Sequence, residues 1–156
     1  MTIAAILGID VTAQSTTPEF IPGQLGVVTG SNGTKIYKYL KYDDGTAAVD
    51  GVAGEVAYYY TLDGYKNHVC TSDLSDSVEI GAGVIQANIA TETYGWFQIK
   101  GAATLTIALT AGADGDPLTP TGSADGTLDV SSAATDNVCA IAGDISDKEI
   151  ICDFPM

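Results

Sequence analysis

The stretch that decides the fold reads Tyr94-Gly95-Trp96-Phe97-Gln98-Ile99-Lys100-Gly101. It contains the only tryptophan and one of the three phenylalanines of the chain. Phe97 and Ile99 have one parity, whereas Trp96 falls on the other with polar neighbours. A period of two residues is typical of a β-strand with one apolar face and one mixed face. The stretch therefore predicts a strand that lies over the core.

A second alternating segment follows the small residues at 101–103. Residues 104–109 alternate Thr or Ala with Leu or Ile, which predicts another strand. The two strands are expected to share one core. Five apolar side chains of common parity are assigned to it: Phe97, Ile99, Leu105, Ile107 and Leu109.

The rest of the chain consists of short alternating segments separated by turn sequences. Five Asp-Gly pairs and one Asn-Gly pair lie between them, and both pairs favour tight turns. No segment sustains the 3.6-residue period of an amphipathic helix. We expect an all-β protein, an antiparallel β-sandwich or barrel with an extended N-terminal arm.

The domain organisation follows from where apolar runs and prolines fall. Residues 25–156 are expected to form a β-rich domain, with a possible internal boundary in the polar segment 71–80. Residues 1–24 combine an apolar run with Pro18 and Pro22, which favour an extended path. Two interpretations stay open for them, an arm that docks on a partner or an edge strand and loop of the same domain.

The charge of the chain restricts its partners. Twenty acidic residues stand against six lysines, there is no arginine, and the net charge is -14. Nucleic acid and anionic membranes both require cations on the protein, so neither is an expected partner. The apolar N-terminal run has no cationic flank and is cut short at Asp10, so we expect neither a signal peptide nor a membrane span.

The sequence lacks the residue patterns of common catalytic and metal sites. Its cysteines, Cys70, Cys139 and Cys152, have no zinc spacing and predict no disulfide framework. His68 is the only histidine, and no serine lies in a nucleophile elbow. The acidic segment 114–125 lacks the glutamate that ends a calcium-binding EF-hand loop. We therefore expect no enzyme activity, no cofactor and no metal.

Several short motifs resemble those of a known family. They are residues 94–101, the run Ala113-Asp114-Gly115-Asp116-Pro117-Leu118, the pair Asp125-Gly126 and the closing Ile141-Ala142-Gly143. Together they resemble the capsid decoration, or cement, proteins of tailed bacteriophages. The chain departs from the family pattern at the Ala-Gly-Asp turn, where Asp114 is inserted.

This resemblance implies a structural protein on the outer surface of a phage head. Such a protein binds the major capsid protein, stabilises contacts between its copies and is often a homotrimer. It assembles in the bacterial host cytoplasm and stays on the virion, and reduced cysteines fit that compartment.

The alternative is a carbohydrate-binding or adhesion β-sandwich that uses Tyr58, Tyr59, Tyr60 and Trp96 as a stacking platform. For the capsid protein we expect the interface to use the N-terminal run and apolar side chains that face away from the core. The predicted interface residues are Ile3, Ile6, Leu7, Ile9, Tyr37, Tyr39, Tyr59, Trp96 and Ile151.

Overall fold

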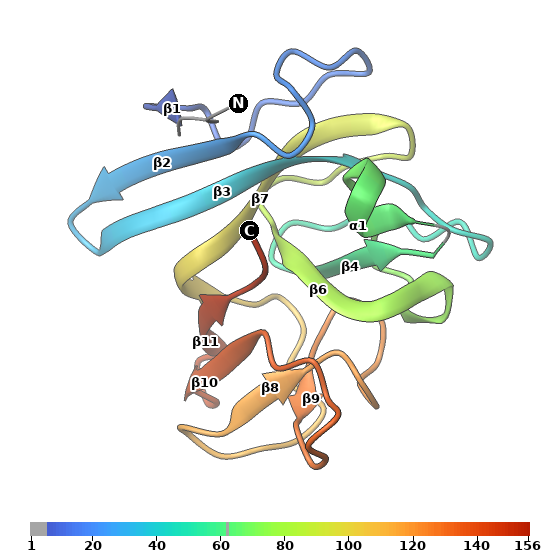
Figure 1. Ribbon diagram of the computed structural model, residues 1–156. Coiled ribbons are helices and arrows are strands. Elements are labelled where there is room, and N and C mark those ends of the chain that lie inside the picture. Colours follow the sequence, from blue (N-terminus) through green and yellow to red (C-terminus); the bar gives the residue numbers. More distant parts are fainter. Residues whose placement is uncertain (1–5, 62) are drawn as a thin grey trace.

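The computed structural model describes residues 6–61 and 63–156, and most of its regular elements are strands (Figure 1). The prediction of an all-β protein is confirmed. In chain order the elements are β1 (Ile6–Leu7), β2 (Leu25–Gly30), β3 (Gly33–Tyr42), β4 (Val56–Tyr60), α1 (Gly64–Asn67), β5 (Val69–Thr71), η1 (Leu74–Asp76), β6 (Ser77–Ile85), β7 (Thr93–Thr104), β8 (Pro117–Thr119), β9 (Asp129–Val130), β10 (Ala140–Asp144) and β11 (Glu149–Asp153).

A closed barrel forms the centre of the fold. Strands β3, β5, β4, β6 and β7 pair in that order, and β3 also pairs with β7, which closes the ring. Strands β2 and β1 extend the sheet beyond β3, and β11, β10, β8 and β9 extend it beyond β7 (Figure 1). Pairing is antiparallel except between β1 and β2 and between β3 and β5. The predicted antiparallel β-barrel is therefore confirmed, with parallel pairing added at these two pairs.

Strand β7 joins the barrel to the outer sheet, and it contains the quoted stretch. Residues 93–100 pair with β3, whereas residues 100–104 pair with β11. Gly101 adopts a φ of 95° between the two halves, a left-handed conformation that glycine accepts without a steric penalty. The buried Gln98 amide donates to the carbonyls of Lys100 and Ala102, at 3.2 and 2.9 Å. Strand β7 is therefore central, as its alternation predicted.

The predicted second strand at 104–109 does not form. The small residues at 101–103 do not break the chain; they pair with β11 as part of β7. After Thr104 the chain leaves the sheet, and Ile107 is 36% exposed. Instead, the backbone N–H of Leu105 donates to the carbonyl of Lys148, and that of Thr106 donates to the carbonyl of Gly54, just before β4. The alternating segment therefore continues from β7 into a loop.

Within the described residues, the apolar interior consists of three clusters rather than one core. Phe97 packs inside the barrel with side chains such as Leu40 and Tyr59. Ile99 and Leu105 belong to a larger cluster under the outer sheet. The prediction that these residues share one core is therefore wrong, because β7 passes from the barrel to the outer sheet between Phe97 and Gly101.

The segment before β2 packs against the rest of the same chain. Strand β1 pairs with β2, and the backbone of Ser15 exchanges two hydrogen bonds with Tyr94. Residues 71–80, considered as an internal boundary, contain η1 and the start of β6, which pairs with β4. Ile3 lies outside the described residues.

Candidate functional site

The structure separates the predicted interface residues into buried and exposed groups. Tyr37, Tyr39, Tyr59 and Trp96 are all buried. Leu7 is 79% exposed and Ile151 is 49% exposed. Ile9 is half-buried, and Ile6 belongs to β1.

The N-terminal segment covers the aromatic side chains of β3 and β7. Tyr37, Tyr39 and Trp96 form a third cluster, and the half-buried Ile9, Val11 and Phe20 pack against it. The Phe20 ring centroid lies 5.1 Å from that of Trp96 and 5.3 Å from that of Tyr39. These rings were expected to need a partner's cover, but residues of the same chain already cover them.

The predicted stacking platform is also absent. Tyr58 and Tyr59 are fully buried, and Tyr58 donates to the carbonyl of Thr127 at 2.5 Å. With Trp96 buried too, only Tyr60 among the four rings remains half-buried. The sequence pattern correctly indicated rings on both faces of β4, but both faces lie inside the protein. The adhesion hypothesis therefore loses the surface on which it was based.

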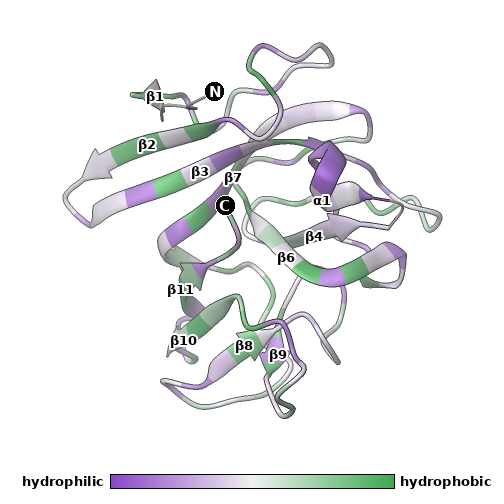
Figure 2. Ribbon diagram, in the orientation of Figure 1, coloured by the Kyte–Doolittle hydropathy of each residue, from purple (hydrophilic) through white to green (hydrophobic). Residues whose placement is uncertain are grey.

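An exposed apolar row crosses the outer sheet, and Ile151 lies at its centre. Ile151 is paired with Ile141 on β10 and with Ala102 on β7, and Ile141 is paired with Pro117 on β8. Directly paired residues point to the same face, so these four side chains form one line. We call Ala102, Ile151, Ile141 and Pro117 the apolar row. Figure 2 shows a hydrophobic segment on β10, the strand that contains Ile141.

The apolar row is exposed on one face while the opposite face is packed. Ile141 is 44% exposed, whereas its neighbours Ala140 and Ala142 are buried. Lys100 and Asp153 form an ion pair on one side of the row. Ile151 was predicted from the sequence but Ile141 was not, because alternation gives Ile141 the parity of the buried Cys139.

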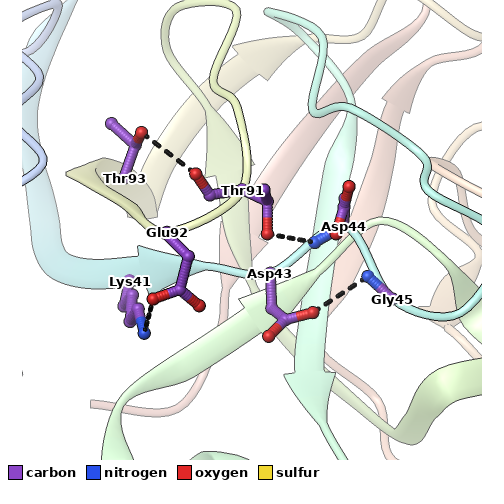
Figure 3. A network of polar contacts seen from close by, with 7 residues as sticks. All are labelled: Lys41, Asp43, Asp44, Gly45, Thr91, Glu92 and Thr93. Atoms are coloured by element: carbon purple, nitrogen blue, oxygen red, sulfur yellow. Dashed lines mark hydrogen bonds and ion pairs between the residues drawn. The ribbon is translucent and has the colours of Figure 1, made fainter.

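Acidic side chains gather where β3 ends. Lys41 forms an ion pair with Glu92 at 2.6 Å, and Asp43 accepts a hydrogen bond from the backbone of Gly45 at 3.0 Å (Figure 3). The backbone N–H of Asp44 donates to Thr91, which ties this end to the loop before β7. Among the described residues, no group of three or more His, Cys, Asp or Glu side chains is arranged to hold a metal.

The cysteines are buried and unsuited to nucleophilic chemistry. None of the three is in a disulfide, and burial raises the pKa of each thiol, that of Cys152 to about 12. The thiolate is the reactive form, so these thiols are inert at neutral pH. Within residues 6–61 and 63–156, no helix is long and apolar enough to cross a membrane.

A cavity of about 270 Å³ opens beside the barrel. It is lined mainly by apolar atoms, with two nitrogen-bearing side chains on its walls. Its lining residues are Gly23, Leu25, Lys38, Tyr65, His68 and Met156. No sequence pattern marks this group, because its members come from four separate parts of the chain.

Comparisons with protein-family models, curated proteins and solved structures found no match to this chain.

Proposed function

We propose that this chain is a capsid decoration protein of a tailed bacteriophage, which binds the outer surface of the head and stabilises contacts between major capsid proteins. The observation that carries the proposal is the apolar row. It is a line of side chains on one sheet, with Ile141 and Ile151 each more than 40% exposed.

The apolar row has the properties of a protein-binding surface. Apolar side chains gathered on one face, with polar groups at their rim, favour docking of another protein. The ion pair between Lys100 and Asp153 supplies part of such a rim. Because the chain carries a net charge of -14, chance association between copies is opposed, and a stable contact requires a specific apolar surface.

We expect the protein to form a homotrimer that binds the major capsid protein through this surface. Light scattering on the purified protein is expected to give about three times the monomer mass. A monomer at micromolar concentration would reject the trimer while leaving capsid binding open.

The function is tested by replacing Ile151 with Asp and measuring attachment to heads that lack the protein. A carboxylate in the centre of an apolar contact is expected to reduce affinity about tenfold or more, because it would be buried without a partner. Sedimentation of the heads followed by quantification of bound protein gives the measurement.

Val78→Asp is the matched control, because Val78 is 42% exposed on β6, outside the apolar row. It introduces the same charge and should bind like the natural protein. Circular dichroism establishes that both variants fold. Equal attachment of Ile151→Asp and the natural protein would reject the apolar row as the docking surface.

A further inference from the structure

Lys38 is a buried lysine at the mouth of the barrel. It has the parity of Leu40 and Tyr42, which pack inside the barrel, and it is only 3% exposed. Its Nζ donates to the hydroxyl of Tyr59 at 2.9 Å. The same atom lies 5.3 Å from the ring centroid of Tyr59 and 5.0 Å from that of Tyr65. Two aromatic faces therefore surround the amine, as in sites that recognise cations.

The charge of Lys38 has no carboxylate partner within the described residues. Their ion pairs involve Lys41 and Lys100, although the chain has twenty acids. A lysine ammonium has three donor hydrogens, and the hydroxyl of Tyr59 accepts one. Burial lowers the pKa of Lys38, since a desolvated ammonium is disfavoured. An anion in contact with Nζ would offset that cost.

His68 lines the same cavity, and one of its ring nitrogens is unmatched. Its Nδ1 is buried and has no hydrogen-bond partner among the described residues. The residue is held in a left-handed conformation, with φ of 59°, and its carbonyl accepts from the backbone of Lys41 at 2.9 Å. Burial and the charge of Lys38 lower the pKa of His68, which favours its neutral imidazole.

Gly23 keeps the histidine ring at the cavity wall. A Cβ at this position would lie 2.5 Å from Cε1 of His68, which no real contact permits. Gly23 also has a φ of 88°. A side chain here would displace the imidazole. The lack of a side chain at Gly23 therefore lets the ring keep its position.

We propose that this cavity binds a small aliphatic monocarboxylate, with the carboxylate on Nζ of Lys38 and the apolar chain between Leu25 and Tyr65. One negative charge matches one ammonium, and the hydrocarbon matches the mainly apolar lining. A doubly charged phosphate fits less well, because the lining offers one ammonium and is otherwise mainly apolar.

The cavity lies on the barrel, whereas the proposed capsid contact lies on the outer sheet. Its volume of about 270 Å³ is just below the ~300–1,000 Å³ of pockets that hold drug-sized molecules, so the ligand is small. This proposal does not depend on capsid attachment. A result that rejects either proposal leaves the other standing.

The test is a titration of the natural protein with sodium butanoate, followed by NMR. His68 is the only histidine, so its imidazole signals report on the cavity without overlap. Butanoate is expected to shift these signals saturably. Sodium chloride at equal ionic strength and 1-butanol at equal concentration should not. A butanoate response that is linear, or that either control reproduces, overturns the proposal without any variant.

Lys38→Met removes the ammonium and keeps an apolar side chain of similar length. It is expected to weaken butanoate binding about tenfold or more, because a charge-assisted hydrogen bond is lost. Lys66→Met is the matched control, because it removes the same charge from a lysine that is exposed on α1. Saturable binding that survives Lys38→Met in a folded variant, or is lost equally in both variants, contradicts the assignment.

Discussion

Phe97→Ala is expected to lower the free energy of unfolding by about 3–5 kcal/mol, because it leaves a cavity inside a closed barrel. Phe97 is 1% exposed and packs in the cluster that includes Tyr42, Ile85 and Ile89. The barrel wall cannot collapse into the gap without breaking the β3–β7 pairing that closes it. Urea denaturation followed by circular dichroism gives the measurement.

Ile107→Ala is the control for this change. Ile107 lies ten residues after Phe97 and was predicted to share a core with it. In the structure it lies in a loop and is 36% exposed. Its truncation should cost less than about 1 kcal/mol, as for most exposed positions. Equal losses for the two variants would show that the division between barrel interior and surface is wrong at these positions.

Deletion of residues 1–24 is expected to lower the free energy of unfolding by roughly 3–6 kcal/mol, because three partly buried apolar side chains are lost. Ile9, Val11 and Phe20 cover the aromatic cluster, and Trp96 is its largest ring. The deletion exposes that ring to water. The fluorescence of Trp96, the only tryptophan, should therefore shift to longer wavelength in the folded truncated protein.

A deletion of residues 1–5 alone is the control, because it keeps every described contact of the segment. It should leave both the emission of Trp96 and the urea midpoint close to those of the natural protein. If the longer deletion also leaves both unchanged, the segment does not cover the cluster in solution.

The alternation around Trp96 was sufficient to predict the central strand but not its neighbours. A period of two residues shows that successive side chains face opposite ways; it does not show whether one or both faces are covered. Trp96 and Tyr59 were therefore assigned to a surface. The cover comes from Phe20 and from the barrel itself, through contacts distant in sequence.

One strand boundary was predicted wrongly, at a run of glycine and alanine residues. A run of small residues at 101–103 resembles a break between strands, and Gly101 does adopt a positive φ. Pairing with β11 nevertheless holds the run within β7. Since β11 lies almost fifty residues later, no local signal could have revealed this partner.

The candidate site could be predicted only in part. Ile151 was found because it lies among acidic residues on the side of the strand opposite Cys152. The apolar row needed the register between β10 and β11, which sequence alternation alone leaves open. The cavity residues Lys38 and His68 come together through the β3–β5 pairing, which is parallel and was not expected.

The central claim is that the chain is a component of a phage head. The most direct test is to find a tailed phage whose genome encodes the chain and to analyse its purified heads by quantitative mass spectrometry. The account predicts that the chain is present at a ratio to the major capsid protein that is constant between preparations and survives washing. Heads that carry none of the chain, or amounts that vary with each preparation and wash away, would contradict the proposed function.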